Sequence, residues 1–281
     1  MAGGLMAQKL RTDGEKGPGS KDVSPGSSPL PPPEQKVVYV RDMFRRIAHR
    51  YDLMNRLMTF GRDQAWRRYT VSQLDLGRAN PSGSACRSPL ILDVATGTGD
   101  LALEALRQCP DASVVGLDFV SEMLALARQK ASAAKPDRPD YPAPQSLVLS
   151  VGDALALPFA DSAFDGVVTG FALRNVTDIP AVFAEMARVT RPGGRVACLE
   201  IAKPRTPLFR RLFALYFYRL VPVVGGWITG QRSAYTYLPH SLTAFLTPGE
   251  IAGVMRQTGW RNIRVRRLMF GTVAVHVGIR E

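Results

Sequence analysis

The sequence predicts an α/β protein with a Rossmann-like, mostly parallel central sheet. Residues 90–100 read LILDVATGTGD, in which an apolar run ends in a Gly-spaced turn. Apolar residues at helical spacing follow this turn, so the segment is typical of a buried strand, a tight turn and a helix. A second apolar strand, Ser113–Asp118, ends in an acid 21 positions after Gly97. This order and spacing are those of a nucleotide-binding βαβ unit.

The remaining elements follow from apolar patterning along the chain. Helical spacing over residues 37–69, broken at Gly61, predicts two or three helices before the sheet. A capping box at Thr247 and Glu250, with Pro248 at the first helical position, predicts a helix that ends at Thr258. The other predicted helices span residues 121–130 and 178–190, and the other predicted strands span residues 147–151, 164–169, 195–201, 263–268 and 272–279.

The Gly-spaced turn indicates an adenosyl cofactor. Gly97 and Gly99 lack a Cβ and can adopt a positive φ, so the backbone can approach a ligand closely. Asp118, at the end of the second strand, is placed to accept the hydroxyls of a ribose. Asp93 lies just before the turn, where it would repel a pyrophosphate but attract the ammonium of S-adenosylmethionine. We therefore expect S-adenosylmethionine, with NAD or a purely structural turn as alternatives, because GTGDLA also fits the GxGxxA dinucleotide pattern.

Composition and charge bound the possible functions. The 281 residues are 46% hydrophobic, which suffices for one catalytic α/β domain with a tail. The three cysteines have no metal-binding spacing, so we expect no bound metal and a reducing compartment. Of the net charge of +12, a net +10 lies in residues 201–281, with twelve Lys and Arg against two Asp and Glu. This basic region is either a solvated face or a contact for an anionic surface, namely membrane lipid or nucleic acid.

The N-terminal part divides into an arm and a helical segment. Residues 1–36 are rich in Gly, Pro and Ser and lack apolar periodicity, which predicts a disordered arm. The arm lacks the apolar core of a secretory signal, and its acids are not typical of a transit peptide, so we expect a cytoplasmic protein. Residues 37–69 are interpreted as a helical lid, in which Tyr51, Asp52 and Asn55 form a polar set. Such a set either caps and packs the helices or lines a pocket.

Residues 208–228, LFRRLFALYFYRLVPVVGGWI, form the most apolar and aromatic stretch. Three arginines, Pro222 and a Gly pair interrupt it, so we do not expect a transmembrane helix. With arginines on one face and Phe, Leu and Tyr on the other, the stretch can lie on a bilayer surface. A core helix is the alternative, and both hold if the helix covers the site. We assign residues 208–246 to an insertion that faces substrate or membrane.

The segment FALRN follows directly after the strand predicted over residues 164–169. Ligands of open α/β sheets bind beyond the carboxyl ends of the strands, so Arg174 and Asn175 are the main candidates on the substrate side. A surface loop with an ordinary Arg and a turn Asn is the alternative. Glu200, inside the strand predicted over residues 195–201, is a candidate pocket-facing acid.

Eight segments cover nearly everything from residue 37 to residue 280. They read RYDLMNRLMTFGRDQAWRR, DVATGTGD, GLDFVSEML, GDALALPFADSAFD, GFALRNVTD, ARVTRPGGRVACLEIAKP, YTYLPHSL and GTVAVHVG. Together they resemble the ubiquinone/menaquinone biosynthesis C-methyltransferase family. The resemblance implies a class I S-adenosylmethionine-dependent methyltransferase domain over residues 37–281, with an antiparallel last strand. GLDF and CLEIAKP resemble the menaquinone branch more closely than the ubiquinone branch.

The resemblance also implies a reaction and a set of cofactor residues. The substrate would be a polyprenylated quinol, converted from demethylmenaquinol to menaquinol, and 2-polyprenyl-6-methoxy-benzoquinol of the ubiquinone route is the alternative. Asp153 and Ala154 would contact the adenine. Gly170 stands where the family often has a serine that touches the cofactor, so only its backbone would contribute. The full predicted cofactor set is Asp93, Thr96, Gly97, Thr98, Gly99, Asp118, Phe119, Asp153, Ala154 and Gly170.

Chemistry assigns roles to the substrate-side residues. A free phenol has a pKa of about 10, so a cation that stabilises the phenolate makes the ortho carbon more nucleophilic at neutral pH. Arg174 suits this role, and a bound water would carry the proton, oriented by Asn175 and by Tyr51 or Asp52.

We expect peripheral contact with the anionic inner face of the cytoplasmic membrane and no nucleic-acid partner. The oligomeric state is open, with a homodimer among the alternatives.

Three rival functions remain. The basic C-terminal part is compatible with a nucleic-acid methyltransferase, but FALRN stands where such an enzyme would have an NPPY-type turn. An NAD-dependent reductase is disfavoured by Asp93. A regulatory module that only binds the cofactor is disfavoured by the presence of the GFALRN segment.

Overall fold

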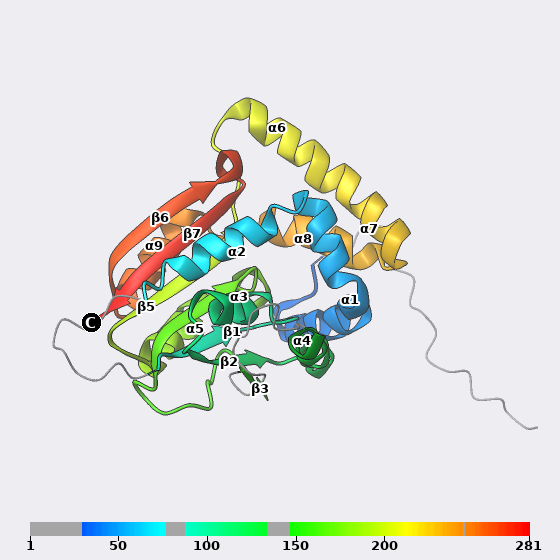
Figure 1. Ribbon diagram of the computed structural model, residues 1–281. Helices are drawn as coiled ribbons and strands as arrows, with labels where there is room; N and C mark the ends of the chain where they lie inside the picture. The colour runs from blue at the N-terminus through cyan, green and yellow to red at the C-terminus, as the bar shows by residue number, and fades with distance from the viewer. Residues whose placement is uncertain (1–29, 77–87, 134–146, 244) are drawn as a thin grey trace, which may run out of the picture.

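The computed structural model describes residues 30–76, 88–133, 147–243 and 245–281 as one seven-stranded sheet covered by helices (Figure 1). The strand order is β3-β2-β1-β4-β5-β7-β6, in which β7 runs antiparallel to both β5 and β6 and the other pairs are parallel. The strands are Leu90–Val94 (β1), Ser113–Asp118 (β2), Leu147–Val151 (β3), Phe164–Gly170 (β4), Thr190–Ile201 (β5), Trp260–Leu268 (β6) and Val273–Arg280 (β7). The predicted fold class, including the antiparallel last strand, is confirmed.

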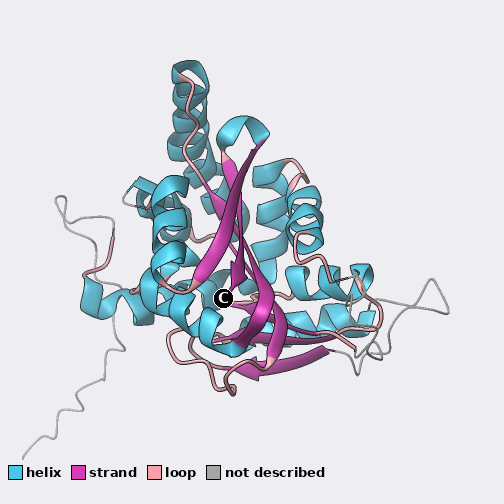
Figure 2. Ribbon diagram, turned by 90° about the vertical axis from the view of Figure 1, so that its left-hand side faces the viewer, coloured by secondary structure: helices cyan, strands magenta, loops and turns pink. Residues whose placement is uncertain are grey.

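Helices cover both faces of the sheet, which Figure 2 shows from its edge. They are Lys36–Thr59 (α1), Asp63–Ser72 (α2), Asp100–Gln108 (α3), Ser121–Ala133 (α4), Ile179–Val189 (α5), Pro207–Leu215 (α6), Val221–Thr229 (α7), Arg232–Thr243 (α8) and Pro248–Gln257 (α9). Short helical turns are Pro33–Gln35 (η1), Leu173–Asn175 (η3), Tyr216–Leu220 (η4, a π-helix) and Met269–Gly271 (η5). Because both faces are covered, the central strands are mostly apolar, as is typical of parallel strands.

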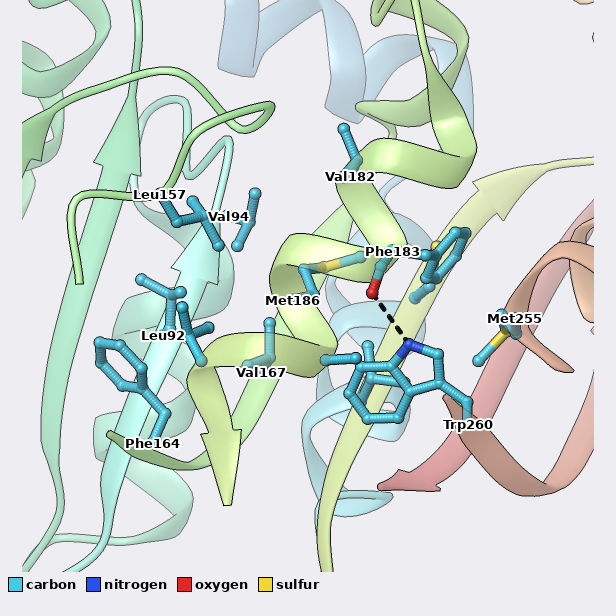
Figure 3. Packing of buried hydrophobic residues seen from close by; sticks show 14 of the residues in the cluster. Leu92, Val94, Leu157, Phe164, Val167, Val182, Phe183, Met186, Met255 and Trp260 are labelled. Atoms are coloured by element: carbon cyan, nitrogen blue, oxygen red, sulfur yellow. Dashed lines mark hydrogen bonds between the residues drawn. The ribbon is translucent and has the colours of Figure 1, made fainter. Parts of the chain in front are cut away.

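Alternate residues of β1 belong to the hydrophobic cores on the two faces of the sheet. Leu92 and Val94 pack with α5 and α9, whereas Ile91 packs with α3. Figure 3 shows the first core, in which the Trp260 indole donates a hydrogen bond of 3.1 Å to the Phe183 carbonyl. This bond satisfies the polar atom of a large, fully buried side chain.

The observed helices and strands largely agree with the predicted ones, and strand boundaries differ where strand pairing, rather than the local sequence pattern, sets them. The helical segment before the sheet is one long helix, α1, followed by α2, and it breaks at Phe60 and Gly61 with φ of 51° and 71°. Strand β5 starts at Thr190 rather than residue 195, because the intervening turn joins the pairing with β4 through a register shift. The capping box of α9 is present, with Thr247 accepting from the Glu250 N–H.

Residues 208–228, in which Pro222 and a Gly pair interrupt the apolar run, are helical throughout. α6, η4 and α7 form one continuous helix over Pro207–Thr229. Pro222 lies just after the π-helical turn η4, in which the usual i→i−4 hydrogen bonds that a proline would break are already replaced. Gly225 is needed for packing, because a Cβ there would overlap the Tyr235 ring. By length and composition alone, this helix is also apolar enough to cross a bilayer, and it is the one such helix among the described residues.

Residues 1–29 of the expected arm lie outside the described residues. The end of the arm packs on the domain, since Leu30 contacts the apolar cluster that α1 forms with α7 and α8. Helix α1 then begins at Lys36. The predicted lid and the predicted insertion therefore share one core, which holds them together above the carboxyl ends of the parallel strands (Figure 1).

Candidate active site

Two cavities adjoin at the carboxyl ends of the parallel strands. The glycine-turn cavity lies between α1 and the ends of β1, β2 and β4. The apolar cavity, of about 200 Å³, lies between α1, α2, η3 and the helices α6 to α8. Four side chains line both cavities, namely Phe44, Tyr51, Phe171 and Asn175. A ligand in one cavity would therefore meet a ligand in the other at these residues.

The glycine turn brings backbone close to the first cavity. Gly97 has φ of 57°, and a Cβ on it would meet no atom within 4 Å, so its face is open. Its N–H donates to Oδ2 of Asp118 at 2.8 Å, and Oδ1 of Asp118 accepts from the Val120 N–H at 2.9 Å. Gly99, with φ of 81°, serves packing instead, because a Cβ there would lie 3.0 Å from Cβ of Ala127.

Six of the ten predicted cofactor residues line the glycine-turn cavity, and four do not. The lining residues are Gly97, Asp118, Phe119, Asp153, Ala154 and Gly170. At Gly170 a Cβ would lie 2.8 Å from Cδ1 of Leu101, so the serine that is frequent in the family would meet this leucine. Asp153 is exposed, and its Oδ1 accepts from the Leu155 N–H at 2.9 Å. The other four, Asp93, Thr96, Thr98 and Gly99, are not among the residues that line this cavity.

Asp93 anchors the turn from beneath. The residue is fully buried, and its Oδ2 accepts from the Thr96 hydroxyl at 2.6 Å and from the Ala102 N–H at 3.0 Å. Burial raises the pKa of this carboxyl to about 7. Its Oδ1 has no hydrogen-bond partner among the described residues. One acceptor below the turn is thus left for a ligand or a water.

Asp52 lies in an ion network rather than in a cavity wall. Its Oδ1 accepts from the Thr98 hydroxyl at 2.6 Å, and its Oδ2 pairs with Nζ of Lys130 at 2.8 Å. Lys130 also pairs with Asp100 at the start of α3. Through these contacts Asp52 joins α1 to the glycine turn and to α4. Its neighbour in sequence, Tyr51, points into both cavities.

Arg174 lies in the wall of the apolar cavity and pairs with Glu200, which does not itself line the cavity. Both residues are buried, and Nη1 of Arg174 lies 3.4 Å from Oε2 of Glu200. The other carboxylate oxygen, Oε1, accepts from the Leu173 N–H at 2.7 Å. Burial raises the pKa of Glu200, and the nearby Arg174 charge opposes that rise. Nε of Arg174 is buried without a hydrogen-bond partner among the described residues.

Asn175 is held at the boundary of the two cavities. Its Nδ2 donates to the Phe171 carbonyl at 3.4 Å, and its Oδ1 accepts from the Tyr237 hydroxyl at 3.4 Å. Burial raises the pKa of Tyr237 to about 12, so this hydroxyl stays neutral. Phe171 has φ of 60°, an uncommon backbone conformation for a residue with a side chain. Strained backbone of this kind clusters at functional sites.

Sequence reasoning missed part of the apolar cavity. Tyr237 comes from α8, and periodicity does not predict that α8 meets η3. The segment YTYLPHSL, one of those that carry the family resemblance, contains Tyr237 and is the signal that could have found it. Phe44 and Phe171 were not singled out either, although both line the two cavities. Asn55, noted as one of the polar set in α1, lines the apolar cavity.

The glycine-turn cavity fits S-adenosylmethionine. The open face of Gly97 admits a ligand against the backbone, and Asp118 retains acceptor capacity for two hydroxyls beyond its two backbone bonds. The unpartnered Oδ1 of Asp93 suits a cation or a water that bridges to one. The sheet order with an antiparallel β7, together with this turn and acid, defines a class I S-adenosylmethionine-dependent methyltransferase.

The chain belongs to the ubiE/COQ5 methyltransferase family, whose model matches residues 33–280. It is 45% identical over 252 residues to a demethylmenaquinone methyltransferase of Roseiflexus castenholzii, covering 90% of this chain and 98% of that one. It is 42% identical to a demethylmenaquinone methyltransferase of Deinococcus radiodurans, covering 89% and 96%. It is 40% identical to a ubiquinone/menaquinone biosynthesis C-methyltransferase UbiE of Geobacter sulfurreducens, covering 85% and 87%. The predicted family is confirmed.

Solved structures show the same fold at low sequence identity. A possible histamine N-methyltransferase of Thermotoga maritima is similar with a TM-score of 0.54 and 13% identity, covering 85% of this chain and 100% of that one. Human N-acetylserotonin methyltransferase, solved in complex with S-adenosylmethionine, is similar with a TM-score of 0.53 and 16% identity, covering 85% and 57%. These neighbours confirm the methyltransferase fold.

Proposed function

We propose that the protein transfers a methyl group from S-adenosylmethionine to a ring carbon of a polyprenylated quinol, converting demethylmenaquinol to menaquinol. The observation that carries the proposal is the shared wall of the two cavities. Phe44, Tyr51, Phe171 and Asn175 separate a cofactor-type cavity from an apolar one whose polar end is Arg174. The menaquinone route is supported by relatives named demethylmenaquinone methyltransferase at 42% and 45% identity.

The cofactor would be held by the residues around the glycine turn. Asp118 would accept the ribose hydroxyls, and Gly97 would bring backbone against the ligand. Phe119, Asp153 and Ala154, which line the same cavity, would surround the adenine. When bound, the cofactor supplies an electrophilic methyl. The enzyme's remaining tasks are to align the quinol carbon with that methyl and to make the carbon nucleophilic.

Arg174 would stabilise the quinol as a phenolate. A phenol of pKa about 10 is mostly neutral at pH 7, and an adjacent guanidinium favours its anion. Arg174 itself cannot take up the proton, since its pKa is above about 12. The proton therefore passes to water, which Asn175 and Tyr51 would orient at the shared wall. The carbon that gains the methyl loses its hydrogen as a proton, which restores the aromatic ring as a phenolate. That oxygen takes back one proton to give the quinol, so one proton is released in each turnover.

Two further residues would act by positioning. Glu200 fixes the Arg174 guanidinium and stays outside the substrate's reach beneath it. Asp52, which we predicted as a catalytic residue, instead holds Thr98 and Lys130, so we propose that it positions the glycine turn relative to Tyr51.

The ring of the substrate decides between two related activities. The apolar cavity suits a naphthoquinol, and the smaller 2-polyprenyl-6-methoxy-benzoquinol of the ubiquinone route is the second candidate. The similarity to a relative whose name covers both routes is compatible with either substrate. We further propose that the protein works at the cytoplasmic side of a membrane, because its substrate carries an isoprenoid tail and its C-terminal part is strongly basic.

A methyl-transfer assay with labelled S-adenosylmethionine tests the proposal. Reduced demethylmenaquinone, the methoxy-benzoquinol and total RNA are offered in parallel reactions. We expect label in the menaquinol product. Label only in the benzoquinol would move the protein to the ubiquinone route, and label only in RNA would refute the quinol assignment.

A further inference from the structure

The outer face of the continuous helix α6–η4–α7 is an exposed apolar surface. Large apolar side chains recur along it at helical spacing and are more than half exposed, namely Leu208, Leu212, Leu215, Leu220, Val223 and Trp227. Trp227 is 87% exposed. Only 22% of the most apolar part of this helix is buried. The helix is therefore not a core helix. Figure 1 shows it along the outer edge of the molecule.

The inner face of the same helix forms the wall of the apolar cavity. Phe213, Tyr216 and Phe217 line that cavity. Phe217 and Val221 are buried in the cluster that the helix forms with α1 and α8. The Tyr216 hydroxyl donates to the Met58 carbonyl at 2.8 Å, which ties the helix to the end of α1. A single helix therefore separates the cavity from the exposed apolar surface.

Side chains at one end of the helix belong to both the cavity and the surface. Phe60 is 75% exposed and yet lines the apolar cavity, and its ring lies 6.0 Å from that of Tyr216. Met269, in the turn between β6 and β7, is also exposed and lines the cavity. Beside it, the exposed Phe270 stacks on Phe209 of α6 at 4.5 Å. Phe60 and Met269 are thus exposed parts of the cavity wall, and together with Tyr216 they mark a mouth of the cavity beside the helix.

The charge around this surface is of one sign. Between Glu200 and Glu250 the chain has no Asp or Glu, and it has six basic residues: Lys203, Arg205, Arg210, Arg211, Arg219 and Arg232. Arg210, Arg211 and Arg219 lie on the helix itself and are exposed. Arg219 lies within the apolar face, four residues from both Leu215 and Val223. An apolar face that also carries arginine matches the interface of a bilayer that contains anionic lipid.

We propose that the mouth between Phe60, Tyr216 and Met269 is where the isoprenoid tail leaves the active site, and that the exposed face of α6–η4–α7 lies in the bilayer surface beside it. The inference rests on the proposed function. A cavity of about 200 Å³ is smaller than the roughly 300–1,000 Å³ of clefts that bury drug-sized ligands, so it holds a ring but not a long tail as well. The mouth passes the tail directly from the cavity to the lipid.

The helix lies on the bilayer rather than across it. Its inner side chains pack on α1 and α8, and crossing the membrane would strip Phe217 and Val221 from that core. One apolar face and one packed face are what a helix at the interface requires. The surface therefore serves as a monotopic contact that leaves the fold intact.

Tryptophan fluorescence tests the contact directly. The protein has three tryptophans, of which Trp227 is highly exposed. Trp260 is fully buried, and Trp66 lines the apolar cavity. Vesicles of phosphatidylcholine and phosphatidylglycerol with brominated acyl chains should quench the wild-type emission, and Trp227→Phe should remove most of that quenching. Equal quenching in wild type and Trp227→Phe would overturn the contact.

A set of surface variants tests the tail exit. The variant Leu212→Ser/Leu215→Ser/Trp227→Ser should bind these vesicles roughly tenfold or more weakly. Its activity on a long-tailed quinol in vesicles, divided by its activity on a tail-less quinol in solution, should fall by a similar factor. The matched control is Val148→Ser/Val151→Ser, which changes two exposed side chains on β3 at the opposite edge of the sheet.

The outcomes separate the two proposals. An unchanged ratio in the helix variant, with wild-type activity on both quinols, would overturn the tail exit and leave the quinol assignment standing. Failure of the wild type to methylate either quinol would overturn the quinol assignment itself. A ratio that falls equally in the β3 control would show that the effect is not specific to the helix and would also overturn the tail exit.

Discussion

Nη1 of Arg174 lies 3.4 Å from Oε2 of Glu200, in a buried ion pair of which Arg174 lines the apolar cavity and Glu200 does not. The carboxylate is fixed in turn by the Leu173 N–H, so the guanidinium is held from behind. A cation fixed in this way needs no reorganisation when negative charge develops on a substrate oxygen, which is the condition for electrostatic catalysis.

Removing the Arg174 charge should reduce turnover. In Arg174→Gln we expect kcat to fall about 10²–10³-fold, because one preorganised group that stabilises developing charge contributes on this scale. Affinity for S-adenosylmethionine should stay within about twofold, since Arg174 lines the apolar cavity and not the glycine-turn cavity. Steady-state kinetics and calorimetry measure the two quantities. Unchanged kcat would remove Arg174 from the mechanism.

Glu200 should act through Arg174. Glu200→Gln keeps an acceptor for the Leu173 N–H but removes the charge that positions the guanidinium, so we expect kcat to fall roughly tenfold. In the Arg174→Gln background the same change should lower kcat no further, because there is no guanidinium left to position. Independent, additive losses in this double-mutant cycle would show that Glu200 acts by another route. Thermal unfolding of each variant controls for loss of the fold.

Asp118 should determine cofactor affinity. Asp118→Asn weakens the acceptor for the ribose hydroxyls, so we expect S-adenosylmethionine to bind roughly tenfold or more weakly. Asp111→Asn is the matched control, because Asp111 is exposed and lies two residues before the other end of the same strand. Isothermal calorimetry compares the two variants. Equal affinity in wild type and Asp118→Asn would place the ribose elsewhere.

Asp93 should make the stability of the ligand-free protein depend on pH. Its pKa is about 7 in the folded protein against an ordinary 3.8, so the folded state retains a proton that the unfolded state has lost. Stability should therefore fall as pH rises from about 4 to 7, with a slope of up to roughly 1.4 kcal/mol per pH unit. Asp93→Asn should remove that slope in denaturant unfolding. The same slope in both proteins would mean that other groups cause it.

Local patterns in the sequence were enough to predict the sheet and the glycine turn. The spacing of Gly97 and Asp118 predicted that both would contact one ligand. Gly97 follows β1 and Asp118 ends β2, and the parallel register of these strands brings the two residues together. Arg174 and Asn175 were predicted from the same rule, since they follow the end of β4. The role of Asp93 beneath the turn, with Thr96 and Ala102 as partners, could not be read from its position alone.

Contacts between distant helices could not be predicted. Lys130 reaches Asp52 across 78 positions, and no periodicity in either helix encodes that pairing. The sequence predicted a helical segment over residues 208–228, but not how it tolerates Pro222 and Gly225. Pro222 lies just after the π-helical turn η4, and Gly225 leaves room for the Tyr235 ring where α7 packs on α8.

The most direct test of the central claim compares the reduced and oxidised forms of one substrate. Labelled S-adenosylmethionine is incubated with demethylmenaquinol and, separately, with demethylmenaquinone, and the ring position of the label is determined by mass spectrometry. If a phenolate stabilised by Arg174 makes the carbon nucleophilic, label should appear on the ring carbon ortho to a hydroxyl of the quinol and not on the quinone. Equal labelling of the two forms, or labelling of neither, would contradict the account.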